Sequence, residues 1–136
     1  MSKSKIVICT LVSLFTVAVL ICTISFINPI RRPQKLVEKY VLKEVPLGTS
    51  MVDAIDMVED KSEWRIYYVS KESGYCINKY GYADPYSDLD DVCAKYIKVH
   101  LGTYRVVFDC DVIAFLGFDE EDNLIIVTVN KQYDSL

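Results

Sequence analysis

The sequence predicts an α+β protein in which an apolar membrane helix precedes two short helices packed on a four- to five-stranded antiparallel sheet. An uncharged run of twenty-two residues, Ile6–Ile27, follows the first five residues of the chain. Apolar residues then recur at three- and four-residue spacing as far as Asp60, as in amphipathic helices, and alternate with a two-residue period from Trp64, as in strands. Helices that come before strands in one small domain are typical of an α+β architecture with the helices on one sheet face.

The run at Ile6–Ile27 predicts a retained membrane anchor. An apolar stretch of about 18 or more residues is long enough for a helix to cross roughly 30 Å of hydrocarbon. A cleaved signal peptide is the alternative, but its apolar core spans roughly 7–15 residues and ends at small residues, which Phe26-Ile27-Asn28-Pro29 does not offer. Ile21 before Cys22 offers no lipoprotein site either. We expect a short basic tail at residues 1–5 and a single-pass plasma-membrane anchor at residues 6–27, with the lipid bilayer as a partner.

The flanking charges leave two orientations open. Lys3 and Lys5 precede the run, whereas five basic residues and only Glu38 as an acid follow it within residues 31–43. The rule that positive flanks stay in the cytoplasm favours a cytoplasmic domain. A very short basic N-terminus, by contrast, is how signal-anchors begin, and on that ground we expect the C-terminal domain to be extracytoplasmic.

The charge of the domain argues against nucleic acid as a partner. From Glu44 onward the chain has eighteen acidic and eight basic residues, a net charge of −10. Nucleic-acid binding requires a basic face, which this composition does not provide. The basic stretch at residues 31–43 has two interpretations, contact with anionic lipid head groups or a solvated linker helix.

Two prolines, Pro29 and Pro33, mark the end of the membrane helix, because proline cannot continue a helix and disfavours helical angles in the residue before it. Apolar residues at helical spacing follow Pro33. They predict a short amphipathic helix, so that residues 28–45 form a juxtamembrane linker and residues 46–136 form the small α+β domain.

Capping-box spacing marks the first helix of that domain, since Ser50 can cap the amides of a helix in which Asp53 is the third residue. Turn residues and alternation then predict the strands. Val112–Leu116 is apolar on both faces, so we place it at the centre of the sheet. We expect strands at Trp64–Val69, Tyr75–Lys79, Tyr96–Leu101 and Leu124–Asn130, one long or two consecutive strands from Arg105 to Phe118, turns at Glu72-Ser73-Gly74, Gly102-Thr103 and Asp119–Asn123, and a loop at Gly81–Asp91.

Two stretches resemble known families. Pro46–Ile55, PLGTSMVDAI, resembles the helix entry of the SmpA/OmlA (BamE-like) envelope proteins and of the related β-lactamase-inhibitor-protein fold. Val112–Glu120 with Leu124–Val127 is similar to hairpins in small uncharacterised exported proteins of Gram-positive bacteria. The resemblance implies an envelope domain for binding or scaffolding without enzymatic activity, and it transfers no partner. The chain departs from the pattern because it has no lipobox and no second glycine motif.

Cysteine and histidine provide little support for catalysis. Cys76, Cys93 and Cys110 have no C-x-x-C spacing, so neither a zinc site nor a thioredoxin-type motif is indicated. We expect buried thiols, with one disulfide among them as the alternative in an oxidising compartment. His100, the single histidine, could act as a base for Cys93 or Cys110, but no flanking signature supports such a dyad, and a surface-facing strand histidine is expected. We therefore expect no catalytic residue, cofactor or metal ion.

The stretch at residues 75–91 contains the best binding candidates. Its acidic residues, like those at residues 119–122, lack the EF-hand spacing and are expected to be solvated turns. Tyrosine offers a large contact area with a polar tip and is favoured at binding surfaces, although it also populates strands. The predicted partner-binding residues are Tyr75, Tyr80, Tyr82, Tyr86, Asp88 and Asp90.

These observations predict a membrane-anchored, non-enzymatic envelope protein whose domain binds another protein as a scaffold or an inhibitor. Tethering raises the local concentration of the domain, so weak binding suffices. One alternative is an immunity-type inhibitor, because the acidic charge suits a basic toxin. The other alternative is a small cysteine-dependent enzyme that uses Cys93 or Cys110.

Overall fold

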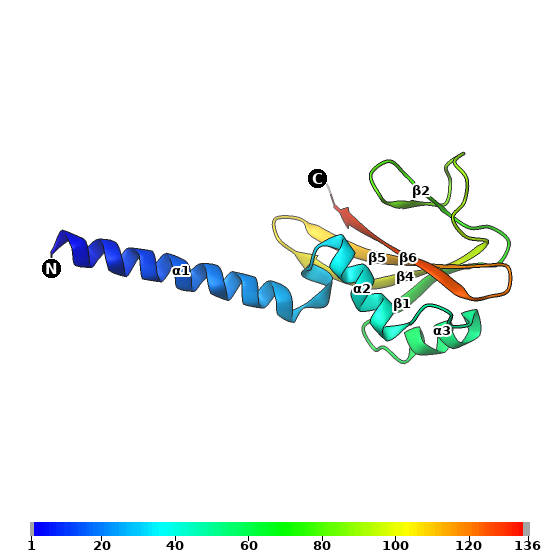
Figure 1. The fold of residues 1–136 in the computed structure, drawn as a ribbon, viewed down its shortest axis with the longest axis horizontal. Helices are drawn as coiled ribbons and strands as arrows, with labels where there is room; N and C mark the ends of the chain where they lie inside the picture. The colour runs from blue at the N-terminus through cyan, green and yellow to red at the C-terminus, as the bar shows by residue number, and fades with distance from the viewer. Residues whose placement is uncertain (1, 135–136) are drawn as a thin grey trace.

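The structure, a computed structural model, describes residues 2–134. A long helix, α1 (Lys3–Ile27), projects from a domain built of short helices and strands (Figure 1). Helices followed by an antiparallel sheet confirm the predicted α+β class. After α1 the elements are η1 (Pro29–Arg31, a 3₁₀ turn), α2 (Gln34–Glu44), α3 (Met51–Glu59), β1 (Arg65–Ser70), β2 (Cys76–Ile77), β3 (Ala83–Asp84), β4 (Lys95–Arg105), β5 (Asp109–Phe118) and β6 (Leu124–Tyr133).

Helix α1 is long and apolar enough to cross a membrane. The stretch Lys3–Ile24 has a mean hydropathy of 2.7, and none of its most apolar part is buried against the domain. The hydroxyls of Thr10 and Thr16 each donate a hydrogen bond of 2.9 Å to the carbonyl four residues earlier. These polar groups are therefore satisfied within the helix, as an apolar environment requires.

Four strands form the main antiparallel sheet in the order β1-β4-β5-β6, so β5 lies inside it. Val112–Leu116 of β5 is buried, which confirms the prediction of a central strand at these residues. Asp119–Asn123 forms the turn between β5 and β6, also as predicted. The side chain of Ser50 accepts a hydrogen bond from the amide of Asp53 at 3.2 Å and caps α3.

The helices pack on one face of this sheet, as predicted, and α2, which lies within the expected juxtamembrane segment 28–45, is one of them. Val37, Val41 and Val45 are completely buried in the same cluster as the inward-facing residues of β4, β5 and β6. The carboxylate of Glu38, also buried, accepts a hydrogen bond from the amide of Val129 at 3.2 Å. These valines, four residues apart, form an apolar stripe that has to be buried, and the packing of α2 against β6 buries it. The domain therefore begins before residue 46.

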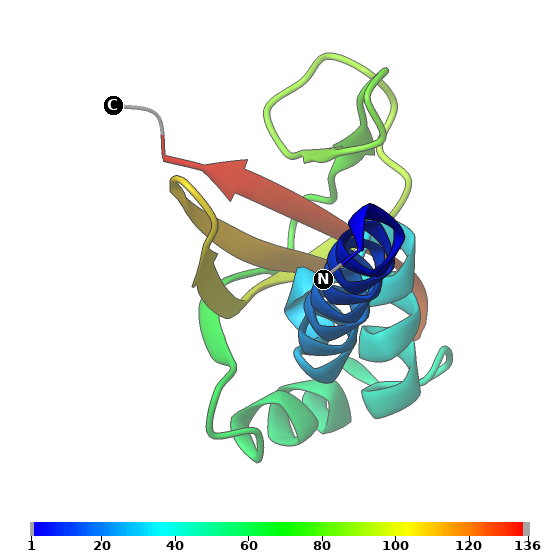
Figure 2. The same cartoon turned by 90° about the vertical axis from the view of Figure 1, so that its left-hand side faces the viewer.

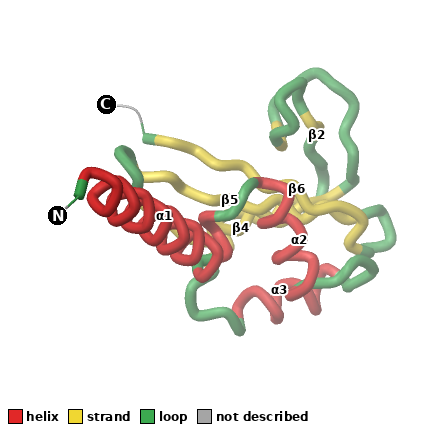
Figure 3. Tube along the Cα trace, turned by 60° about the vertical axis from the view of Figure 1, so that its left-hand side comes forward, coloured by secondary structure: helices red, strands yellow, loops and turns green. Residues whose placement is uncertain are grey.

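Residues 71–94, here called the cover segment, lie over the opposite face of the sheet (Figure 3). The predicted return of Tyr75–Lys79 beside the first strand is wrong, because β1 pairs with β4, and β2 pairs with β3 in a separate two-stranded sheet. The chain turns away at Gly74, where an added Cβ would lie 1.8 Å from the carbonyl oxygen of Cys93. The amide side chain of Asn130 exchanges two hydrogen bonds of 2.9 Å with the backbone of Ala83 and fixes the cover segment to β6.

The turn predicted at Gly102-Thr103 is also wrong. Strand β4 continues to Arg105, and the register of its pairing with β5 shifts between His100 and Gly102. Gly102 has φ +151°, and a Cβ there would lie 3.0 Å from Cδ1 of Ile30. This glycine marks a bulge at a close contact, and the hairpin turn lies further on, at residues 106–108.

Candidate partner-binding surface

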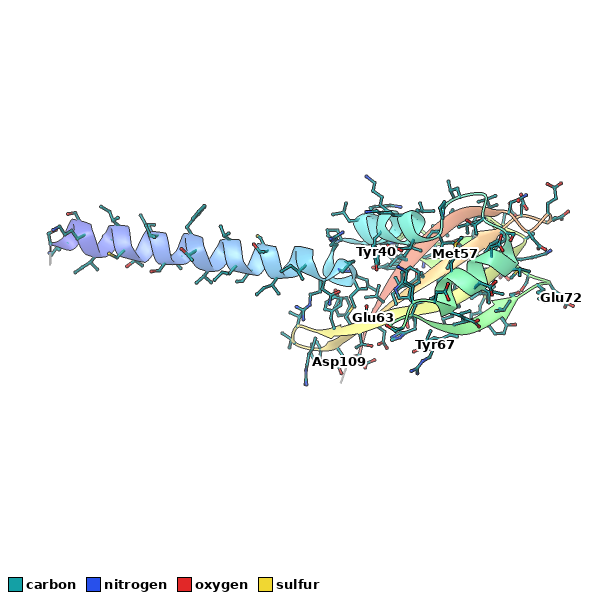
Figure 4. All side chains as sticks on the ribbon, turned by 90° about the horizontal axis from the view of Figure 1, so that it is seen from below. Tyr40, Met57, Glu63, Tyr67, Glu72 and Asp109 are labelled. Carbon is teal, nitrogen blue, oxygen red and sulfur yellow. The ribbon has the colours of Figure 1, made fainter. Side chains whose placement is uncertain are left out.

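A cavity of about 300 Å³ opens on the sheet face that the helices do not cover, and is called the tyrosine pocket below. Its lining comes from three segments: β1, β4 and the cover segment. Figure 4 shows Tyr67 of β1 pointing away from the helices of the domain. The lining residues are Tyr67, Tyr68, Ser73, Pro85, Tyr86, Tyr96 and Lys98.

A bulge in β1 brings two consecutive tyrosines to the same side of the sheet. Ile66 pairs with Val99 and Tyr68 pairs with Lys98, so Tyr67 is an extra residue on β1. In a regular strand, neighbouring side chains point to opposite faces, whereas a bulge breaks this alternation. Tyr67 and Tyr68 are accordingly 50% and 55% exposed, and both line the pocket.

The floor of the pocket is a packed aromatic cluster. The ring of Tyr96 lies 5.8 Å from those of Tyr75 and Phe115, and 5.9 Å from the ring of Tyr68 above it. The hydroxyl of Tyr75 donates to the carbonyl oxygen of Phe115 at 3.2 Å and lies 3.1 Å from the hydroxyl of Thr128. Burial raises the pKa of both Tyr75 and Tyr96, so both hydroxyls stay protonated and the floor is uncharged.

The rim of the pocket is formed by Tyr86, whose side chain is almost completely in solvent at 93% exposure. Its backbone is nevertheless held, because Oδ1 of Asp84 accepts a hydrogen bond from the amide of Tyr86 at 2.9 Å. Oδ1 of Asp119 caps the turn after β5 in the same way, with the amide of Asn123 as donor at 2.9 Å. Aspartates in both acidic loops therefore shape their own turns.

The predicted binding residues divide into four groups. Tyr86 lines the pocket, whereas Tyr80 and the loop residues Asp88 and Asp90 are exposed outside it, and Tyr82 is half-buried. Tyr75 is completely buried, so its prediction as a surface contact is wrong. Its ring fills the space between the cover segment and the sheet, and its hydroxyl finds partners there.

Sequence reasoning named one lining residue, Tyr86, and missed the other six, although one pattern could have indicated two of them. Adjacent tyrosines within an alternating strand imply either that one is buried or that the strand is bulged. Here the strand is bulged, and both rings face solvent. The missed residues are Tyr67, Tyr68, Ser73, Pro85, Tyr96 and Lys98.

Beside the pocket, a polar cluster continues along the same face. The ring of Tyr67 stacks on His100, whose Nε2 lies 3.2 Å from the hydroxyl of Thr103 and 3.3 Å from Oδ1 of Asp111. Hydrogen bonds from Thr103 and then from His100 lower the pKa of Asp111. The contacts of Nε2 are thus oxygen atoms, and the proposed pairing of His100 with a cysteine is not formed.

The three domain cysteines are buried free thiols, as predicted. Cys110 lies in the core on the helix side, and Cys93 in the cluster under the cover segment. Burial raises the pKa of Cys93, which disfavours the nucleophilic thiolate. Within residues 2–134, no three His, Cys, Asp or Glu side chains are grouped so that they could hold a metal ion.

Comparisons with known proteins leave the family open. No protein-family model, curated protein or solved structure matches this chain. The resemblance of Pro46–Ile55 to the SmpA/OmlA and β-lactamase-inhibitor-protein families therefore stays a prediction.

Proposed function

We propose that this chain is a single-pass plasma-membrane protein whose extracytoplasmic domain binds another protein through the tyrosine pocket. The observation that carries the proposal is the exposure of three tyrosines around one cavity. Tyr67, Tyr68 and Tyr86 are 50%, 55% and 93% exposed. Large aromatic rings gathered around a hollow are the usual anchors of protein interfaces, because they bury much area with little side-chain entropy to lose.

The size of the pocket favours a peptide side chain as its occupant. A volume of about 300 Å³ is at the lower limit of small-molecule sites, which span roughly 300–1,000 Å³. One or two apolar side chains of a partner would fill it. The ammonium group of Lys98, which lies 5.8 Å from the ring centre of Phe115, would donate a hydrogen bond to a carbonyl or carboxylate of that segment.

The charge around the pocket favours a partner with a basic surface. Asp88, Asp90 and Asp91 are exposed in the cover segment just beyond Tyr86. The domain as a whole is strongly acidic, with the net charge of −10 from Glu44 onward. Complementary charge accelerates encounter and selects among partners more than it adds affinity.

Anchoring by α1 fits this mode of action. A tethered domain meets partners in the same membrane or in the adjacent space at a high effective concentration, so modest affinity is enough. We propose a scaffold or inhibitor role on this basis. The exposed aspartates beyond Tyr86 favour the second candidate, an immunity-type inhibitor of a basic toxin. The buried thiols of Cys93 and Cys110 give no support to a cysteine-dependent enzyme.

A photocrosslinking experiment tests the proposal. The photoreactive amino acid p-benzoylphenylalanine would replace Tyr86 in the full-length chain in cells, and Tyr80 would be replaced in a matched control. Tyr80 is 70% exposed on the same cover segment but does not line the pocket. We expect a defined crosslinked protein from position 86 and much less of it from position 80. Equal crosslinking from both positions, or none from position 86, would contradict binding at the pocket.

A further inference from the structure

The turn between β4 and β5 exposes three consecutive apolar side chains, called the hairpin tip below. Val106, Val107 and Phe108 are 70%, 73% and 43% exposed. The amide of Val106 donates a hydrogen bond to the carbonyl of Phe108 at 3.3 Å, so the turn is closed. A soluble domain gains nothing from three adjacent apolar side chains in water, and such a patch marks a surface that contacts something apolar.

Contacts at the base of the hairpin fix its place beside the end of α1. The guanidinium carbon of Arg31 lies 5.3 Å from the ring centre of Tyr104. On the same ring, Nζ of Lys131 lies 5.1 Å from the centre and donates to the hydroxyl at 3.1 Å. Nζ of Lys131 also donates to the carbonyl oxygen of Arg32 at 2.6 Å. The last residues of β4 are thus attached to the segment that directly follows α1.

The hairpin also points along α1 toward the N-terminal end of that helix. Residues 101–103 line a cavity of about 420 Å³ together with Ile27 and Asn28, so this part of β4 is level with the end of α1. From residues 101–103 onward, β4 runs alongside α1 toward the N-terminal end of that helix. Asp109, which follows the hairpin tip, lies at the end of the sheet nearest α1 (Figures 1 and 4). Viewed along α1, the hairpin lies to one side of the helix (Figure 2).

The reach of the hairpin matches the depth of the membrane interface. Three to five further residues at about 3.3 Å each extend roughly 10–16 Å along the strand. Segments that lie in the interface bury their apolar face by about 5–10 Å. The exposed side chains of Arg105 and Tyr133 lie nearby, and arginine and tyrosine are residue types favoured at head-group level.

We propose that the hairpin tip inserts into the leaflet from which the domain emerges, as a second membrane contact beside α1. The proposal rests on the proposed function, because it requires that α1 spans the bilayer. Continuity with α1 selects lipid as the occupant, since the tip and the end of the apolar helix share one end of the domain. Two points of attachment would hold the domain, and with it the tyrosine pocket, at a fixed tilt to the membrane.

Tryptophan fluorescence in nanodiscs tests this contact. The full-length chain would carry Phe108→Trp and be placed in nanodiscs of ordinary or brominated phosphatidylcholine, since bromine on the acyl chains quenches nearby indoles. A matched control is Ile125→Trp, because Ile125 is 44% exposed near the start of β6, beside the β5–β6 turn at the opposite end of the sheet. Val12→Trp reports on α1 itself. Trp64, the single native tryptophan, gives the background measured in the unmodified chain.

The expected result is about twofold or greater quenching of Phe108→Trp by brominated lipid, as for a side chain at the level of the upper acyl chains. Ile125→Trp should be unaffected, and addition of Val107→Glu to Phe108→Trp should abolish the quenching. Quenching at Val12→Trp but not at Phe108→Trp would overturn this inference and leave the anchor intact. A parallel measurement uses acrylamide, which quenches indoles exposed to water. If neither acrylamide nor brominated lipid quenches Phe108→Trp, protein covers the tip, and the inference is overturned. Absence of quenching at Val12→Trp would overturn the anchor as well.

Discussion

The ring of Tyr67 lies parallel to that of His100, with ring centres 5.0 Å apart and an angle of 11° between the planes. The pair connects two parts of one surface. On one side of it is the tyrosine pocket, and on the other is the hydrogen-bonded cluster of His100, Thr103 and Asp111. The bulge that turns Tyr67 toward His100 also leaves Tyr68 exposed, so one irregularity of β1 forms the outer wall of the pocket.

The first prediction concerns Asp111. Its pKa in the folded chain is lowered by hydrogen bonds, first from Thr103 and then from His100, relative to an ordinary value of 3.8. A lowered folded pKa gives stability that is present above the ordinary value and is lost as the pH falls through the folded value. Because the side chains of His100 and Asp111 are partly exposed, Asp111→Asn should cost less than about 1 kcal/mol of unfolding free energy at neutral pH.

The measurement for Asp111 is thermal unfolding of the detergent-solubilised chain and of the variant across pH. The difference between them should be present at neutral pH and be lost as the pH falls below the ordinary value of 3.8 and through the lowered folded pKa, because the carboxyl group of the parent chain then also takes up a proton. A difference that is unchanged at low pH would show that the carboxylate charge is not what stabilises this cluster.

The second prediction separates the rim of the pocket from the rest of the cover segment. Tyr86→Ala should weaken binding to the crosslinked partner by about thirtyfold or more, since truncation of an aromatic hot spot costs about 2 kcal/mol or more. Tyr80→Ala should leave the affinity within about twofold, and neither should change the unfolding free energy by more than about 0.5 kcal/mol. Affinity would be measured by surface plasmon resonance. Equal losses for the two variants would place the contact outside the pocket.

The third prediction concerns the buried floor. Tyr75→Phe removes a hydroxyl that bonds to Thr128 and to the carbonyl of Phe115, so it should destabilise the domain by about 1–3 kcal/mol. Thr128→Val should have a similar effect, and the double variant should cost less than the sum of the two, because both changes remove one shared bond. Strictly additive values in urea unfolding would argue against that bond.

How much of this fold could be predicted depended on whether the deciding contact is local. The cap formed by Ser50 and the central position of Val112–Leu116 depend on nearby residues and on burial on both faces, and both predictions are confirmed. Gly102 has the same local pattern as a turn glycine. In the structure it lies at a register shift between β4 and β5 and beside Ile30, more than seventy residues earlier, and no short window of sequence contains these contacts.

The candidate site shows the same limit. A tyrosine-rich stretch beside acidic residues drew attention to Tyr86, which lines the pocket. The same composition included Tyr75, whose partners Phe115 and Thr128 are 40 and 53 residues away and draw it into the core. Lys98 enters the pocket only because β4 pairs with β1, a pairing that short-range alternation does not specify.

The fourth prediction tests whether α2 belongs to the domain. Val37 is completely buried against the sheet, so Val37→Ala should cost about 2 kcal/mol of unfolding free energy. Leu36 on the same helix is 37% exposed, and Leu36→Ala should cost less than about 0.5 kcal/mol. Urea unfolding of the two variants measures the difference. Equal small effects would mean that α2 is a linker after all.

The last prediction concerns orientation, because the short basic tail and the basic stretch at residues 31–43 favour opposite sides. Tyr86→Cys would place a thiol at a site that is 93% exposed, whereas Cys76, Cys93 and Cys110 are buried and give little background. A membrane-impermeant maleimide applied to intact cells should label Tyr86→Cys. Ser2→Cys, before α1, should be labelled only after the cells are opened. The reverse pattern would place the domain in the cytoplasm, and accessibility of both sites from one side would show that α1 does not span the membrane.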